Sequence, residues 1–130
     1  MRKEIIELNE PMIAEFMDLE YINYQQSNGD NGWWKKGTFK DGTSAYNSNF
    51  ICIHNAGLKF HSDWNRLISV FKKIERQGCI VEVSICLANT CSITRASLKN
   101  PCRFVTQSNS LEEAAYDAVV QYINWYNLNK

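Results

Sequence analysis

Two tryptophans and two lysines are consecutive in Trp33-Trp34-Lys35-Lys36, directly after the loop-forming sequence Asn28-Gly29-Asp30-Asn31-Gly32. Exposed tryptophans beside lysines can stack on nucleic-acid bases or anchor a protein partner. The alternative is that one or both tryptophans hold the long loop on the core and leave a solvated lysine pair, because tryptophan is highly buried on average. Packing in the core is the simpler interpretation, and these four residues are the candidate partner-binding residues.

A second set of reactive side chains is Cys52, His54, His61 and Asp63, which could be assembled into a metal site. Cys-X-His lacks the paired ligand spacing of a zinc module, and the sequence has no second such pair. Cys52 with His61 could also form a nucleophile and its base, but nothing indicates a thiol of lowered pKa. A buried Cys52, an exposed His54 and a His61 packed beside a helix start explain the set. We therefore expect no metal and no cofactor.

Motifs that mark common enzyme classes are missing from the sequence. It has no glycine-rich phosphate loop, no GxSxG and no HExxH. The adjacent carboxylates Glu112 and Glu113 follow Ser110 and are explained by capping of a helix start. We therefore expect a protein that is not an enzyme.

Composition indicates one soluble domain. The chain has 130 residues, and 14 Lys and Arg balance 14 Asp and Glu, which argues against binding nucleic acid by bulk charge. No apolar run is long enough to span a membrane, and the first residues are too acidic for a signal peptide. The five cysteines are an odd number without a CxxC pair, which is typical of reduced thiols in a cytoplasm.

The clearest element is a helix within residues 61–78. Apolar residues recur at three- and four-residue steps and should face inward, with Val70 widening the stripe: Trp64, Leu67, Ile68, Phe71 and Ile74. Ser62 or Asp63 can cap the start, and Gly78 can adopt the left-handed stop.

Three strands and a closing helix should follow. Residues 79–87 and 91–95 alternate in polarity, and matching their apolar faces pairs Leu87 with Cys91 and Ile85 with Ile93. This places Cys86 and Cys91 on opposite faces, against a disulfide. A third strand is expected around residues 102–106. Ser110 to Glu113 form a capping box that starts the last helix.

The first half of the chain is less regular. Residues 9–17 predict a short helix capped by Asn9 with Pro11 in its first turn, and residues 5–8 could extend it backwards. Residues 21–24 and 50–53 could form strands, and residues 33–42 a small hairpin or an irregular excursion. Long ordered loops are often functional, so residues 18–60 should hold the specificity of the protein.

Three stretches resemble small phage and prophage proteins of gut anaerobic bacteria that have an α/β/α (ABA) sandwich domain. They are Leu58-Lys59-Phe60-His61 with Trp64 and the run to Glu75, the closing stretch 113–127, and Ile13-Ala14-Glu15-Phe16-Met17. The family usually has Gly after Phe-Met where this chain has Asp18, so the first helix could end differently. The resemblance implies a phage origin and a fold, and it brings no catalytic residues.

We expect a single α+β domain over residues 1–130, an α/β/α-type sandwich with three helices and a small antiparallel sheet of about three strands. The excursion covers residues 18–60, and the two longer helices pack on opposite faces of the sheet or together on one. The expected function is a non-enzymatic phage accessory protein in the bacterial cytoplasm that binds a protein partner. The alternative is weak binding of single-stranded nucleic acid through Trp33 to Lys36. The partner and the oligomeric state stay open.

Overall fold

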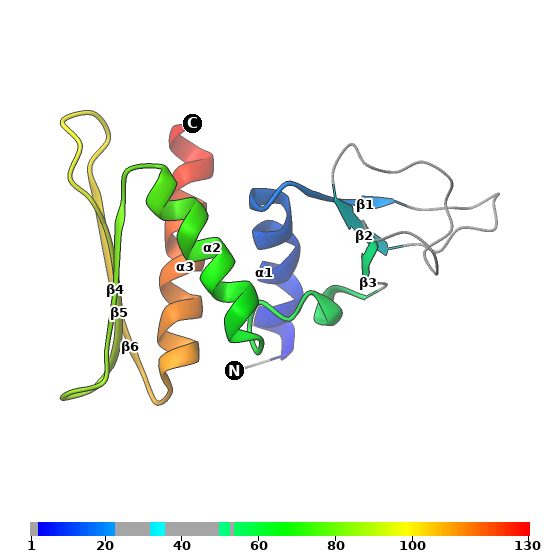
Figure 1. Cartoon of the computed structure of the whole chain (residues 1–130), viewed down its shortest axis with the longest axis horizontal. Coiled ribbons are helices and arrows are strands. Elements are labelled where there is room, and N and C mark those ends of the chain that lie inside the picture. Colours follow the sequence, from blue (N-terminus) through cyan, green and yellow to red (C-terminus); the bar gives the residue numbers. More distant parts are fainter. Residues whose placement is uncertain (1–2, 23–31, 36–49, 53) are drawn as a thin grey trace. The chain divides into compact units, whose positions relative to one another are not determined.

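The computed structural model describes residues 3–22, 32–35, 50–52 and 54–130, and the chain divides into two compact units, Arg2–Lys59 and Phe60–Lys130 (Figure 1). The described residues contain three α-helices and two antiparallel sheets of three strands each. This confirms the α+β class, the three helices and the three-stranded meander before the last helix. The prediction had one sheet of about three strands, and the structure has a second sheet of three strands in Arg2–Lys59.

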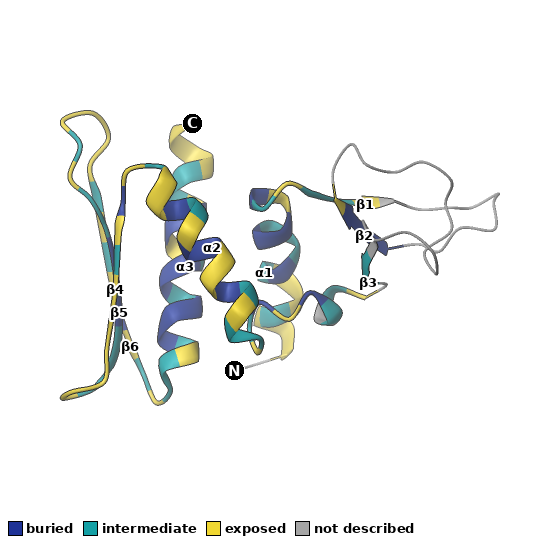
Figure 2. Cartoon of the chain, viewed as in Figure 1, coloured by how far each residue is buried: buried dark blue, intermediate teal, exposed yellow. Residues whose placement is uncertain are grey.

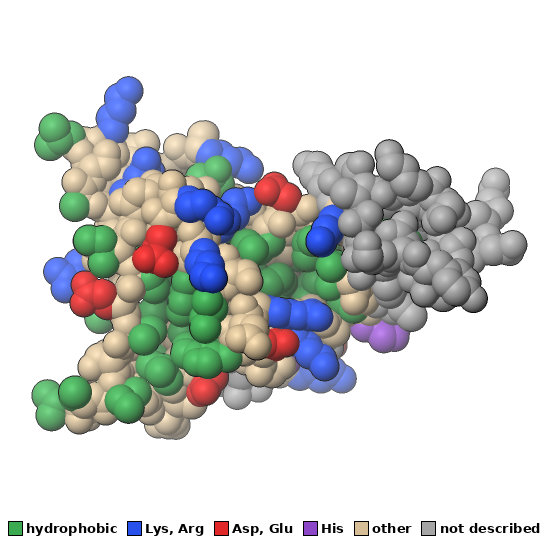
Figure 3. Space-filling view, in the orientation of Figure 1, with side chains coloured by type: hydrophobic (Ala, Val, Ile, Leu, Met, Phe, Trp, Pro, Cys, Tyr) green, Lys and Arg blue, Asp and Glu red, His purple; other side chains and the backbone are tan. Residues whose placement is uncertain are grey.

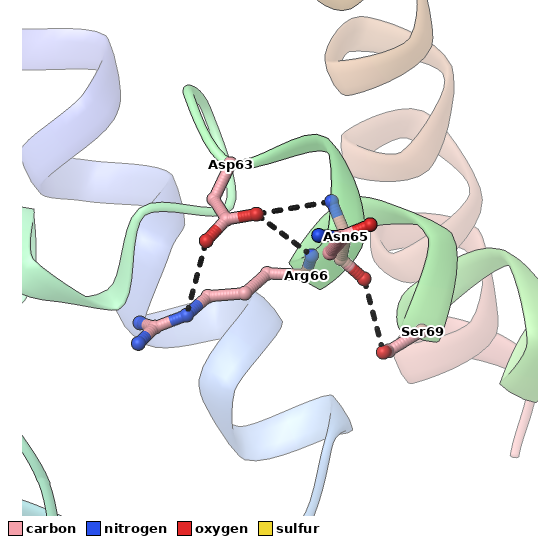
Figure 4. A network of polar contacts seen from close by, with 4 residues as sticks. All are labelled: Asp63, Asn65, Arg66 and Ser69. Carbon is pink, nitrogen blue, oxygen red and sulfur yellow. Dashed lines mark hydrogen bonds and ion pairs between the residues drawn. The ribbon is translucent and has the colours of Figure 1, made fainter.

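The unit Phe60–Lys130 begins with helix α2, Trp64–Arg76. One carboxylate oxygen of Asp63 accepts hydrogen bonds from the backbone N–H groups of Asn65, at 3.0 Å, and Arg66, at 3.4 Å (Figure 4). The other oxygen lies 3.8 Å from Arg66 Nε, and Ser69 donates to the Asn65 carbonyl. Gly78 follows the helix with φ of 91°, the left-handed conformation expected at this stop. The predicted cap and stop are confirmed.

The buried face of α2 differs from the expected one at two positions. Leu67, Val70, Phe71 and Ile74 are buried, whereas Ile68 is exposed and Trp64 is only half-buried. Residues 67, 70, 71 and 74 already form a complete i, i+3, i+4, i+7 stripe, and residues 64 and 68 lie at its edge. Trp64 packs edge-on against Phe71, with ring centroids 6.1 Å apart.

The sheet of this unit contains β4 (Ile80–Ser84), β5 (Asn89–Arg95) and β6 (Cys102–Ser108) in that order. Val83 pairs with Cys91 and Val81 with Ile93, so the predicted pairs Leu87–Cys91 and Ile85–Ile93 are wrong by four residues. The cause is that β4 ends at Ser84, and residues 85–88 form the connection instead of a three-residue turn. An even shift keeps each side chain on its face, so Val81 and Val83 still point to the predicted side.

Helix α3, Leu111–Asn129, covers the face of the sheet that carries Cys91 and Ile93. The Ser110 hydroxyl accepts a hydrogen bond from Glu113 N–H at 3.2 Å, which confirms the forward half of the predicted cap. The buried Thr106 hydroxyl donates to the Ala114 carbonyl and ties β6 to the first turn of α3. Helix α2 packs on β4 and α3, and both helices lie on the same side of the sheet (Figure 1).

The unit Arg2–Lys59 begins with helix α1, Lys3–Phe16. The helix starts before Asn9, so the predicted cap at Asn9 is wrong and Pro11 lies inside the helix, whereas the backward extension through residues 5–8 is confirmed. Residues 3–8 form the first turns, and the proline removes one backbone donor from the helix without ending it. Asp18 follows the helix with φ of 61°, the conformation that glycine adopts most easily.

The sheet of this unit contains β1 (Leu19–Ile22), β2 (Gly32–Lys35) and β3 (Phe50–Cys52), followed by the short 3-10 helix η2 (Asn55–Leu58). β2 pairs with both neighbours in antiparallel fashion, and its register to β3 shifts between Trp33 and Trp34. The strands near residues 21–24 and 50–53 are therefore confirmed in part. Of the predicted loop 28–32, Gly32 instead begins β2. Residues 28–31 of that loop and residues 36–42 of the predicted hairpin lie outside the described residues.

Candidate functional site

Both tryptophans of the candidate segment lie in β2 and are buried. Trp33 is 4% exposed and Trp34 is 0% exposed. The register to β3 shifts between these two residues, so their burial shows that both rings are enclosed and does not assign them to opposite faces of β2. Of the two interpretations of the segment, the burial agrees with packing into the core.

The structure describes one of the two lysines of the segment. Lys35 ends β2 and its side chain is exposed. Lys36 lies outside the described residues. The described part of the segment therefore presents a lysine, and not an indole face, to solvent.

A pocket of about 400 Å³ lies beside Trp33 in the same unit. Its walls come from α1, β1, β2 and the chain around η2, and the lining residues are Pro11, Tyr21, Trp33, His54 and Asn55. Tyr21 and Trp33 are paired across β1 and β2, and their rings meet edge to face with centroids 5.7 Å apart. Tyr21 is 50% exposed, so a ligand can reach its ring.

One hydrogen bond fixes the polar side of this pocket. The Trp33 indole N–H donates to Asn55 Oδ1 at 2.8 Å. Because the carbonyl oxygen of Asn55 takes the indole proton, the amide nitrogen must point elsewhere, and it can offer two N–H donors to a ligand. The pocket thus combines the exposed Tyr21 ring, which packs against the buried Trp33, with the amide side chain of Asn55.

The segment after β3 holds Asn55 in place. The Cys52 thiol donates to the His54 carbonyl at 3.3 Å, and Gly57 N–H donates to the same carbonyl at 2.9 Å. A Cβ atom on Gly57 would lie 2.9 Å from Cys52 Cβ, so only glycine allows this approach of η2 to β3. The exposed His54 agrees with its sequence interpretation.

Trp33 is a candidate binding residue in the sequence analysis, but Tyr21, Asn55 and Pro11, which line the same pocket, are not. Asn55 lies 22 residues away along the chain, and no local motif links the two. Tyr21 was recognised only as part of a strand, and Pro11 only as a helix residue. The fully buried carboxylate of Glu10, next to Pro11 in α1, also had no signal in the sequence.

The residues weighed for metal binding and nucleophilic chemistry fall in different units. Cys52 and His54 belong to Arg2–Lys59, whereas His61 and Asp63 belong to Phe60–Lys130. Asp63 is engaged in capping α2. Among the described residues, no group of three or more His, Cys, Asp or Glu is placed to hold a metal ion.

A second polar cluster lies under the last turns of α3. The Tyr122 hydroxyl donates to Gln77 Oε1 at 2.6 Å, and the Arg95 guanidinium carbon lies 5.7 Å from the centre of the Trp125 ring. Burial raises the pKa of Tyr122, with smaller contributions from Cys79, and burial also raises the pKa of Cys102. Both groups stay protonated at neutral pH, so the cluster is suited to packing and not to nucleophilic attack.

Comparison with protein-family models, curated proteins and solved structures finds no match for this chain. Among the described helices, none is both long and apolar enough to cross a membrane.

Proposed function

We propose that this protein is a non-enzymatic phage or prophage accessory protein of the bacterial cytoplasm, and that its pocket beside Trp33 binds a segment of a protein partner. The phage origin is supported only by the sequence resemblance described above. The binding function is supported by one observation, the pocket in which the exposed Tyr21 ring, packed against Trp33, adjoins the Asn55 side chain that accepts the Trp33 indole N–H.

The chemistry of the lining favours an extended, proline-containing segment. Proline-rich segments dock in grooves lined by aromatic rings, because the polyproline conformation is already formed and loses little entropy on binding. Such a segment has free backbone carbonyls, and the Asn55 amide can donate to one of them. The volume of about 400 Å³ has room for one or two side chains of this kind.

Binding of single-stranded nucleic acid is the alternative. It needs exposed rings for stacking and a basic surface for phosphates. Trp34 is fully buried, and the net charge of the chain is zero, so both requirements are poorly met. Among the residues of this sheet whose burial the structure describes, Tyr21 and Lys35 are exposed and could serve that role.

The test is calorimetric titration of the full chain with a proline-rich peptide of about ten residues and, separately, with oligo(dT). We expect the peptide to bind and Tyr21→Ala to weaken it about tenfold or more, since truncating a central aromatic residue of an interface costs about 2 kcal/mol or more and about 1.4 kcal/mol is tenfold in affinity. Tyr21→Phe, which keeps the ring, and Lys35→Ala, on the same sheet, should bind like the wild type.

Two results would contradict the proposal. The first is an unchanged peptide affinity in Tyr21→Ala with the fold intact by circular dichroism. The second is salt-sensitive binding of oligo(dT) that Lys35→Ala removes, which would favour the nucleic-acid alternative. Trp33→Ala and Trp34→Ala are unsuitable variants because both side chains are buried and their loss would disturb the fold.

A further inference from the structure

Strand β4 and the connection after it carry a concentration of exposed apolar side chains. Exposed large hydrophobic residues occur at four positions between 80 and 87: Ile80, Val83, Ile85 and Leu87. Most of this strand is coloured as exposed in Figure 2. Within the described residues, β4 pairs on one side only, with β5.

The two edge strands of the sheet differ in how they are protected. β6 exposes Arg103 and Gln107 beside Val105, and charged or polar side chains on an edge discourage pairing with another chain. β4 has Glu82 as its charged residue and contains no lysine or proline. β4 is therefore the edge that favours the addition of a further strand.

An apolar surface continues from this edge. Figure 3 shows hydrophobic side chains gathered between the sheet and α2. On α2, Ile68 is exposed and Trp64 is half-buried, the two positions where the helix departs from the expected burial. A partner strand on β4 would also cover part of this surface.

We propose that β4 pairs in antiparallel fashion with β4 of a second copy of this chain, across a two-fold axis at Val83. A two-fold axis normal to the sheet keeps each residue on its own face, so the axis must pass through a residue position. An axis at Glu82 would place two glutamates directly opposite each other, which is destabilising. An axis at Val81 would place Glu82 opposite Ile80 of the second copy.

The axis at Val83 matches side chains by type. It pairs Val83 with Val83 on the face that carries the apolar surface, and it brings Ile85, the first residue after β4, toward Val81 of the second copy on the same face. On the other face, it pairs Glu82 with Ser84, whose hydroxyl can donate to the carboxylate. An axis at Ser84 would pair fewer residues, because β4 ends there. The register at Val83 is thus the self-complementary one.

The result is a continuous six-stranded sheet in a symmetric dimer. Stable interfaces bury about 1,200–2,000 Å² in total, and a pair of strands as short as β4 offers a small contact area. The dimer is therefore an equilibrium that depends on concentration. Its residues belong to Phe60–Lys130, whereas the pocket residues belong to Arg2–Lys59.

The first experiment is sedimentation equilibrium of the full chain over a wide concentration range under reducing conditions. We expect a monomer–dimer equilibrium that Val83→Lys weakens at least tenfold. Val105→Lys is the matched control, because Val105 has a similar exposure, 57% against 45% for Val83, on the opposite edge strand. A wild type that stays monomeric at all concentrations, or an equal loss in Val105→Lys, overturns the proposal.

The second experiment tests the register by cross-linking and does not depend on a change in affinity. Cys86 is exposed near this edge and Cys91 lies opposite Val83 in the β4–β5 ladder, so Cys86→Ser/Cys91→Ala is the background. Residues opposite each other in a ladder have Cα atoms about 4.5–5.5 Å apart, within the range of a disulfide. Val83→Cys should form a covalent dimer on mild oxidation, and Val105→Cys should not. Faster dimer formation by Glu82→Cys than by Val83→Cys overturns the register.

Discussion

The cysteines are distinguished by their burial. Cys79 and Cys91 are buried, Cys86 is exposed, and Cys52 and Cys102 are intermediate. Burial raises the pKa of the Cys91 thiol to about 11, so little thiolate forms in the folded protein. We predict that a thiol reagent at pH 8 modifies Cys86 rapidly and Cys91 only after unfolding. Unfolding without reductant should release five reactive thiols, and a shortfall of two would reveal a disulfide.

The raised pKa of Cys91 also predicts how stability depends on pH. The unfolded thiol has a pKa near 9.0 and the folded one about 11, so the unfolded state loses its proton first. The contribution of the protonated Cys91 thiol to the free energy of unfolding is fully present below pH 9. It falls as the pH rises toward 11, by up to about 1.4 kcal/mol per pH unit. The raised pKa of Tyr122 acts in the same direction. In urea titrations at increasing pH, Cys91→Ala should reduce the decrease in the free energy of unfolding between pH 9 and 11. Cys86→Ala should leave that decrease unchanged.

Trp64 contributes less to the core than its place in the sequence predicts. Full burial would make Trp64→Ala cost about 3–5 kcal/mol. The half-buried ring, held mainly by Phe71, lowers the expected cost to roughly 1–3 kcal/mol. The fully buried Leu67 is the comparison, and Leu67→Ala should cost about 2–5 kcal/mol. Denaturant unfolding of both variants decides the point, and a larger loss from Trp64→Ala would contradict it.

At the scale of elements, the chain places a lysine in a conformation that suits glycine. Lys59 ends η2 with φ of 56°, and Asn100 adopts φ of 52° in the turn before β6. Asparagine adopts this region more readily than lysine. We predict that Lys59→Gly raises the free energy of unfolding by about 0.5–1 kcal/mol and that Asn100→Gly changes it less. Melting temperatures of the two variants provide the test, and an equal gain in both would refute the explanation.

Elements with local signals were predictable from sequence. Asp63 and Gly78 mark the ends of α2, and Ser110 marks the start of α3, because capping depends on residues within one turn. The register of β4 on β5 was not predictable, since Ile85 and Leu87 continue the apolar alternation although the strand ends at Ser84. The pocket was even harder to predict from sequence, because Trp33 and Asn55 lie 22 residues apart along the chain and meet through the folding of the unit.

At the scale of the whole molecule, the substitution Gly57→Ala can show whether the two units lose stability together. Gly57→Ala forces its Cβ against Cys52 Cβ, a form of overpacking that typically costs about 1–3 kcal/mol. We predict that hydrogen exchange accelerates mainly within Arg2–Lys59 and that peptide binding at the pocket weakens, because Asn55 belongs to η2.

The same experiment tests the prediction of a single domain. Acceleration confined to Arg2–Lys59 would mean that Phe60–Lys130 keeps its protection when the other unit opens. Equal acceleration in both units would mean that residues 1–130 unfold as one cooperative domain.

The placement of the four tryptophans has a spectroscopic consequence. Trp33 and Trp34 belong to Arg2–Lys59 and are buried, whereas Trp64 and Trp125 belong to Phe60–Lys130 and are half-buried. Indoles shielded from water emit at shorter wavelengths than hydrated ones. The intrinsic fluorescence of the chain therefore contains a blue component from one unit and a red-shifted component from the other, and wavelength-resolved emission can follow each unit during unfolding without any attached dye.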